Sequence, residues 1–258
     1  MTFLLGRMEY ISKEKYDALH TNHLCRTPWK VNCDSFHSYF GNLHTWRDWG
    51  DKFHTPKREA VPLVNLNGEH FEKVDPSCWP LDRWNFLKSG RKDTPEEWNA
   101  FYKNVLANKS EDLLLDVDFT MPTKHMREKW ADSLEELKPF LTRSCILRWQ
   151  AGARFRPHVD TWHPVRWLRL WGTTTPNKVF LRYRSNRHRH LRRAVSCWND
   201  ITKENEFYAT PEIPIEAGRL YLHDSMVWHE AEATEDDAFQ FFISIHPRAY
   251  DFLFSSIH

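Results

Sequence analysis

The chain has 258 residues, 41% of them hydrophobic and 15% aromatic, which is enough apolar material for a sizeable core. Its 36 basic and 35 acidic side chains leave a formal net charge of +1, which argues against a protein built mainly to neutralise phosphate or coat an acidic membrane. The five scattered cysteines form no Cys-x-x-Cys pair, and the first apolar run, residues 3–5, is too short for a signal or a membrane span. We therefore expect a soluble, cytoplasmic protein with no membrane partner.

The first half of the chain carries helix signals. Thr94, Pro95 and Glu97 combine a capping threonine, a proline at the first helical position and a glutamate three residues after the cap, so a helix is predicted to begin there. Two apolar stripes at helical spacing are predicted to face the core. They are Trp98, Phe101, Tyr102, Val105 and Leu106 in one segment, and Met126, Trp130, Leu134 and Leu137 in another.

Short apolar runs separated by turn residues follow from about Leu141 onward and predict strands. The runs cover residues 145–149, 165–171, 179–183, 219–222 and 239–245. The predicted fold class is mainly β with flanking helices, around a double-stranded β-helix core of the jelly-roll or cupin-like kind. Nothing marks a domain boundary, so we expect one domain over residues 1–258. Its helical or mixed N-terminal part would cover 1–141 and its jelly-roll core 142–250.

A His-x-Asp pair, His158 and Asp160, is the first candidate for metal binding. Side chains two apart on a strand lie on the same face, so both could reach one metal ion. About two His-x-acid pairs are expected by chance from this composition, and the other pair is His70 with Glu72. His158 follows a predicted strand and has histidines downstream, whereas His70 follows an Asn-Gly turn without a comparable partner, so the pair at His158 is preferred.

A third ligand must come from a later strand. The segment 218–229 offers His223 and His229. We take His229 as the ligand and His223 as a strand residue that supports the site. Two histidines and one carboxylate bind one face of an iron ion and leave the opposite positions open for cosubstrate and oxygen.

These segments resemble the aspartyl/asparaginyl β-hydroxylase-like 2-oxoglutarate oxygenases, including the bacterial free-proline cis-4-hydroxylases. The likeness lies in the Arg-Pro-His-Val-Asp run ending at Asp160, in the strand 166–171, and in the spacing of Gly218, Asp224, Ser225 and Met226 to His229. It implies Fe(II) held by His158, Asp160 and His229, 2-oxoglutarate as cosubstrate and ascorbate as reductant. The implied reaction hydroxylates an unactivated C–H of a free or peptidyl amino acid and releases succinate and CO₂.

The same resemblance implies further site residues. Asp160 fills the position that a related halogenase leaves to chloride, so hydroxylation is favoured. A guanidinium matches a carboxylate with two parallel hydrogen bonds, and Arg169 is the closest counterpart of the family's 2-oxoglutarate arginine, with Arg166 next. A second arginine of the family, about nine residues after the distal histidine, is Ala238 here. Arg182 or Arg219 is a candidate to replace it.

Three residues are predicted to contact the substrate or shield the site from water: Arg148, Trp162 and Trp228. Arg148 lies where the proline hydroxylases have an arginine near the substrate. The two tryptophans adjoin the predicted ligands and could keep water out.

A basic stretch over residues 182–193 supports an alternative function. In that alternative the protein is a non-catalytic jelly roll that binds nucleic acid or an acidic partner. The near-zero net charge favours instead a solvated hairpin balanced by the acidic run 230–237, and we expect a small-molecule or peptidyl substrate rather than nucleic acid.

Overall fold

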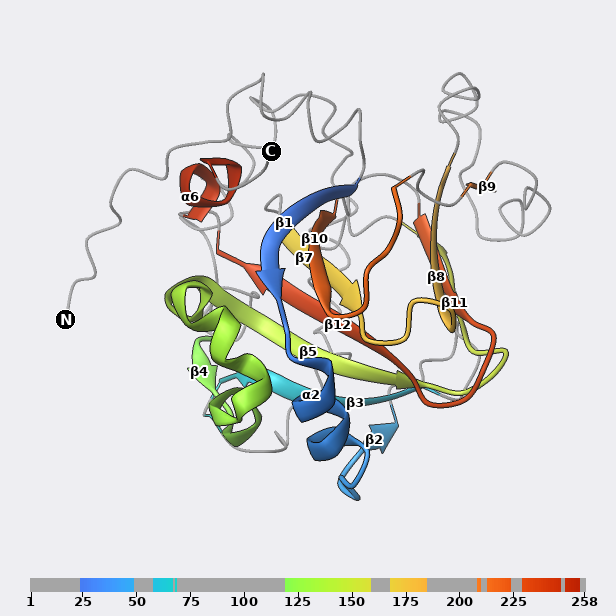
Figure 1. The fold of residues 1–258 in the computed structure, drawn as a ribbon, viewed down its shortest axis with the longest axis horizontal. Coiled ribbons are helices and arrows are strands. Elements are labelled where there is room, and N and C mark those ends of the chain that lie inside the picture. The colour runs from blue at the N-terminus through green and yellow to red at the C-terminus, as the bar shows by residue number, and fades with distance from the viewer. Residues whose placement is uncertain are drawn as a thin grey trace, which may run out of the picture.

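The computed structural model describes residues 24–48, 58–66, 68, 119–158, 168–184, 208–209, 213–223, 229–246 and 249–255. These residues form two antiparallel sheets with helices on the outer side of the larger one (Figure 1). The helix predicted at Thr94 and its apolar stripe lie outside the described residues. So do residues 165–167 of the second predicted strand and 185–193 of the basic stretch.

The larger sheet has the strand order β1-β10-β7-β12-β5-β3-β2, with β4 paired to β3. Its strands are β1 (Leu24–Lys30), β2 (Arg47–Asp48), β3 (Arg58–Asn65), β4 (Met121–Pro122), β5 (Leu141–Trp149), β7 (Leu168–Thr173), β10 (Arg219–His223) and β12 (Ala238–Ile245). The smaller sheet has the order β6-β11-β8-β9. Its strands are β6 (Arg154–His158), β8 (Val179–Arg184), β9 (Tyr208–Ala209) and β11 (His229–Ala233).

The core is a jelly roll, as predicted. From β5 to β8 the chain alternates between the two sheets, and it alternates again from β9 to β12. The strand order in each sheet, with β10-β7-β12-β5 facing β6-β11-β8-β9, is that of a double-stranded β-helix. All five predicted strand regions contain a strand, with ends that coincide with the prediction or are shifted by up to four residues.

The N-terminal part extends the larger sheet at both edges. β1 pairs with β10, and β3 pairs with β5. Helix α2 (Cys33–Phe40) begins at Asn32, whose side chain accepts a hydrogen bond from the backbone N–H of Ser35 at 2.9 Å. The other helical elements of the described residues are two 3₁₀ segments, η2 (Lys124–Arg127) and η3 (Lys129–Phe140), drawn in green in Figure 1, and α6 (Tyr250–Ser255).

The second predicted stripe is confirmed as core, but its backbone is 3₁₀ rather than α-helical. Met126, Trp130, Leu134 and Leu137 are all buried in one cluster with the outer face of the larger sheet. Pro139 within η3 has no N–H to donate, which works against a regular α-helical ladder at that end. Helical spacing predicted the buried face here and could not distinguish the two helix types.

Trp130 anchors this outer cluster. Its ring lies 5.5 Å from those of Phe36 and Phe40 and 6.0 Å from that of Phe241 on β12, and its Nε1–H donates to the His125 carbonyl at 2.9 Å. We expect Trp130→Ala to lower the free energy of unfolding by about 3–5 kcal/mol, because it leaves a large cavity and an unpaired carbonyl. Urea unfolding measures this, with Lys129→Ala, at an exposed position of η3, as the control. A Trp130→Ala loss no larger than that of the control would contradict this packing.

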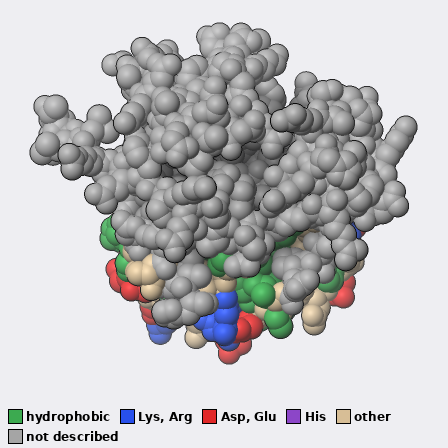
Figure 2. All heavy atoms as spheres, turned by 90° about the horizontal axis from the view of Figure 1, so that it is seen from above, with side chains coloured by type: hydrophobic (Ala, Val, Ile, Leu, Met, Phe, Trp, Pro, Cys, Tyr) green, Lys and Arg blue, Asp and Glu red, His purple; other side chains and the backbone are tan. Residues whose placement is uncertain are grey.

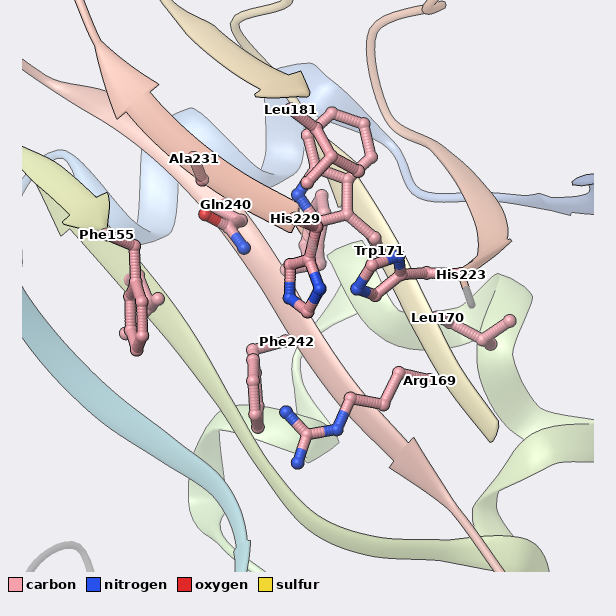
Figure 3. Close-up of a pocket in the computed structure, with 12 residues that line it drawn as sticks. Phe155, Arg169, Leu170, Trp171, Leu181, His223, His229, Ala231, Gln240 and Phe242 are labelled. Atoms are coloured by element: carbon pink, nitrogen blue, oxygen red, sulfur yellow. The ribbon is translucent and has the colours of Figure 1, made fainter. Parts of the chain in front are cut away.

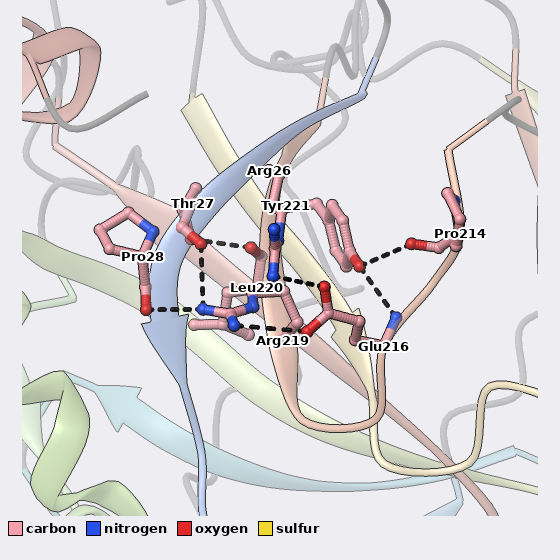
Figure 4. Close-up of polar contacts among 8 residues, drawn as sticks. All are labelled: Arg26, Thr27, Pro28, Pro214, Glu216, Arg219, Leu220 and Tyr221. Carbon is pink, nitrogen blue, oxygen red and sulfur yellow. Dashed lines mark hydrogen bonds and ion pairs between the residues drawn. The ribbon is translucent and has the colours of Figure 1, made fainter. Parts of the chain in front are cut away.

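A cluster of polar contacts links β1, β10 and the segment before β10 at this edge of the larger sheet (Figure 4). The buried Tyr221 hydroxyl donates to the Pro214 carbonyl at 3.0 Å and accepts from the Glu216 N–H at 2.9 Å. Burial raises the pKa of Tyr221 above its ordinary value, so the phenol stays protonated as this donor. Arg219 donates to the Pro28 carbonyl at 2.8 Å and lies 3.3 Å from a Glu216 carboxylate oxygen, which commits its guanidinium to this edge.

No helix within the described ranges is long and apolar enough to cross a membrane. Figure 2 shows one face of the molecule, on which described acidic and basic side chains lie close together among apolar ones. This mixture fits the formal net charge of +1.

Candidate active site

A small cavity of about 40 Å³ lies between the two sheets of the jelly roll. Its described lining is mostly apolar, with four polar side chains: Arg169, His223, His229 and Gln240 (Figure 3). The apolar lining comes from both sheets and includes Leu147, Phe155, Trp171, Leu181 and Phe242. A mostly apolar pocket with a few convergent polar groups is the common form of a ligand site.

His229 is the predicted metal ligand that the structure places in this pocket. It is the first residue of β11, its side chain is 5% exposed, and it pairs in register with His158, the last residue of β6. The register therefore places the backbone positions of the two predicted histidines directly opposite one another on the smaller sheet.

The complete metal triad is not tested by the described residues. The backbone of His158 is described but its side chain is not, and Asp160 lies outside the described residues. Within the described part of the chain, no group of three or more His, Cys, Asp or Glu side chains forms a metal-binding arrangement. A buried imidazole opposite a second histidine is nevertheless a donor set that suits iron, so the residues present fit the implied metal.

His223 is the second imidazole of the pocket. It is the last residue of β10 and lines the cavity, on the same inner side of the sheet as Tyr221, because these two residues alternate with outward-facing neighbours. The Tyr183 hydroxyl is hydrogen-bonded to His223 Nδ1. Tyr183 was not predicted, and the alternation along 179–183, which places it on the same face as Leu181, could have identified it.

Arg169 is a buried guanidinium in the pocket. Its side chain is 4% exposed and its guanidinium carbon lies 4.1 Å from the centre of the Phe242 ring. Arg169 pairs in register with His223, so the cation lies at the level of the histidines. Arg166, the other arginine considered on this strand, lies outside the described residues.

The structure does not bring Arg148 to the pocket. Leu147 lines the cavity, so the next residue on β5 faces the outer side of the sheet. There the Arg148 Nε donates to Glu59 at 2.8 Å, and its guanidinium lies over Trp46 at 4.9 Å. The two tryptophans predicted beside the site, Trp162 and Trp228, lie outside the described residues.

Arg182 also faces outward, which removes it as a replacement for the second arginine of the family. On the outer face of the smaller sheet its Nε lies 2.8 Å from Glu230, and its Nη2 forms an ion pair with Glu232. Glu230 is 1% exposed and also accepts a hydrogen bond from Arg154 Nε at 3.0 Å. Arg219 is bound at the sheet edge, so neither proposed substitute reaches the cavity.

The carboxylate of Glu230 links all three strands β6, β11 and β8 directly behind His229. We expect Glu230→Gln to lower the free energy of unfolding by about 2–4 kcal/mol, because two guanidiniums lose their shared buried counter-charge. Chemical unfolding at low ionic strength measures the loss. Glu235→Gln, at a position whose side chain is 61% exposed, is the control and should change stability little. Equal stability of the two variants would contradict this role.

A second buried guanidinium, Arg58, was not predicted. Arg58 pairs with Trp149 on β5, and Trp149 pairs with Ala238 on β12, so the three residues share one face at one level of the larger sheet. Arg58 is fully buried, and its guanidinium carbon lies 4.2 Å from the centre of the Phe155 ring, which lines the cavity. Ala238 stands where the family resemblance implies an arginine. On this side of the barrel a buried guanidinium is supplied instead by Arg58 of β3, a strand that precedes the jelly-roll core.

No protein-family model matches the chain, and no curated protein sequence matches it significantly. Several solved structures are similar at low identity. HygX from Streptomyces hygroscopicus, with nickel, 2-oxoglutarate and hygromycin B bound, is 10% identical, with 92% of this chain and 88% of HygX covered and a TM-score of 0.41. The carbocyclase SnoK from nogalamycin biosynthesis, described as non-heme and alpha-ketoglutarate-dependent, is 12% identical, with 92% and 86% covered and a TM-score of 0.45.

The epimerase SnoN, in complex with Fe³⁺, alpha-ketoglutarate and nogalamycin RO, is also 12% identical, with 91% and 86% covered and a TM-score of 0.41. These values are too low for the likeness to decide the chemistry of this chain.

Proposed function

We propose that the protein is a 2-oxoglutarate- and Fe(II)-dependent dioxygenase that hydroxylates an unactivated C–H of an amino acid, free or peptidyl, with release of succinate and CO₂. The observation that carries this proposal is the position of His229. It is buried in the cavity of a jelly roll and lies in register with His158 on the neighbouring strand.

The metal would be held by His158, Asp160 and His229. The register supplies the two histidines from adjacent strand ends, and Asp160 is two residues beyond His158, the spacing that repeats one face of an extended chain. When bound, Fe(II) supplies the oxygen chemistry that side chains lack, with ascorbate keeping it reduced. The protein supplies the ligands and a mostly apolar cavity around them.

The cosubstrate would be bound by Arg169. A 2-oxoglutarate dianion needs cationic donors, and Arg169 presents a buried guanidinium at the level of the histidines. Phe242 lies against the guanidinium and limits its rotamers, so that little side-chain freedom remains to be lost when a carboxylate binds. No acidic side chain belongs to the described lining of the cavity, which suits an anionic ligand.

The alternative function, binding of nucleic acid through residues 182–193, gains no support from the described residues. Arg182, the first cation of that stretch, is paired with Glu230 and Glu232. A guanidinium already paired with two carboxylates contributes less free energy to binding a phosphate.

The proposed function is tested by measuring succinate formed from 2-oxoglutarate with Fe(II) and ascorbate, across a panel of free amino acids and short peptides. We expect succinate to depend on added Fe(II) and to rise when one member of the panel is present. Slow succinate formation without stimulation would support the chemistry and point to a substrate outside the panel. Failure to bind either Fe(II) or 2-oxoglutarate would refute the proposal, and a salt-dependent affinity for RNA or DNA would then favour the alternative.

A further inference from the structure

A second imidazole lies beside the proposed ligand His229. His223 ends β10 of the larger sheet and His229 begins β11 of the smaller one, so the two rings come from opposite walls of the jelly roll. Their centres are 4.5 Å apart and their planes are at 85°. Both side chains are buried, and Figure 3 shows the rings turned toward one another inside the cavity.

This arrangement matches two imidazoles bound at neighbouring positions of one metal ion. A metal–nitrogen bond of roughly 2.1 Å and a right angle between neighbouring positions of an octahedral ion place two ring centres ~4–5 Å apart. The observed separation falls within that interval.

Tyr183 provides an independent observation. Its hydroxyl is hydrogen-bonded to Nδ1 of His223, and Tyr183 itself pairs in register with His229 on β11. Metal-binding histidines usually have their second ring nitrogen hydrogen-bonded to a fixed oxygen, which sets both the tautomer and the ring orientation. When Nδ1–H donates to the Tyr183 oxygen, Nε2 of His223 is the unprotonated ring nitrogen, which is the form that can bind a metal ion.

We propose that His223 is a further ligand of this metal centre, coordinating through Nε2 and held in place by the Tyr183 hydroxyl. The inference rests on the proposed function, since it takes a metal at His229 as given. The two proposed histidines and the carboxylate would hold three of the six positions of an octahedral ion, and His223 would hold a fourth. A cosubstrate that chelates through two atoms would need the other two. His223 would therefore be a displaceable ligand, whose release opens a position for oxygen.

The test is a titration of the metal-free, full-length protein with Co²⁺ in the absence of 2-oxoglutarate, followed by calorimetry and by visible absorption. His223→Phe keeps a ring of similar size, His223→Gln keeps a polar side chain, and Tyr183→Phe removes only the hydroxyl. His44→Phe, at an exposed position outside the cavity, is the control. Thermal melting of each metal-free variant confirms that it is folded.

We expect His223→Phe to weaken Co²⁺ binding by about tenfold or more and to change the absorption of the bound ion, because one nitrogen ligand is lost. Tyr183→Phe should weaken binding by a smaller factor, and His44→Phe should bind like the unmodified protein. Unchanged affinity and absorption in a folded His223→Phe or His223→Gln variant would overturn the inference, and would leave the proposed function standing if His229→Ala still loses the metal. Absence of Co²⁺ binding by the unmodified protein would instead refute the metal site itself.

Discussion

Replacing His229 by alanine should lower metal-dependent succinate formation by at least about a hundredfold, because the ligands that remain hold Fe(II) too weakly at working concentrations. His229 is the predicted ligand whose side chain is both described and buried in the cavity. The loss should appear in the metal titration as well as in turnover, since the same imidazole would serve both. Succinate release is measured at saturating 2-oxoglutarate, with Fe(II) varied over a wide range.

The control for this variant is His44→Ala, which changes an exposed histidine outside the cavity. Partial recovery of His229→Ala at high Fe(II) would still agree with a lost ligand, because the ion would bind more weakly. Full activity at low Fe(II) would place the metal elsewhere. Loss of activity together with unchanged metal affinity would also contradict the assigned role.

The sequence predicted the jelly roll because its strands are short, apolar and separated by turn residues. Side-chain alternation then indicates which residues share a face, and the structure places His229 on the face that lines the cavity. The likeness of the Gly218 to His229 segment to a family singled out this histidine rather than His223. In the structure both histidines line the same cavity. The sequence therefore distinguished which histidine is the proposed ligand, and both lie at the candidate site.

The arginines show where sequence reasoning fails. Arg148, Arg169 and Arg182 all lie on predicted strands, yet only Arg169 faces the cavity. Which face is the inner one depends on the pairing of distant strands, and a one-residue difference in phase reverses it. The burial of Arg58 could not be predicted from the sequence for the same reason. Its position beside Trp149 results from the pairing of β3 with β5, and these strands are separated by 75 residues of intervening chain.

Arg169→Met should weaken binding of 2-oxoglutarate to the metal-loaded protein by about thirtyfold or more. A buried guanidinium donates charge-assisted hydrogen bonds to a carboxylate, and removal of the guanidinium leaves the carboxylate charge without compensation. Binding is measured by calorimetry under anaerobic conditions, so that no turnover contributes to the heat. Arg148→Met is the matched control, since Arg148 is an arginine of the same sheet that faces outward.

Arg58→Met decides which buried guanidinium holds the carboxylate. Arg58 and Arg169 are the buried arginines of the described residues, and Arg58 packs against the ring of Phe155, which itself lines the cavity. Because Arg169 lines the cavity directly, we expect Arg58→Met to change the dissociation constant of 2-oxoglutarate by less than about threefold. The opposite ranking of the two variants would move the anchor to Arg58, beside the position where Ala238 replaces the family's arginine. Phe155 would then have to turn aside as the cosubstrate binds.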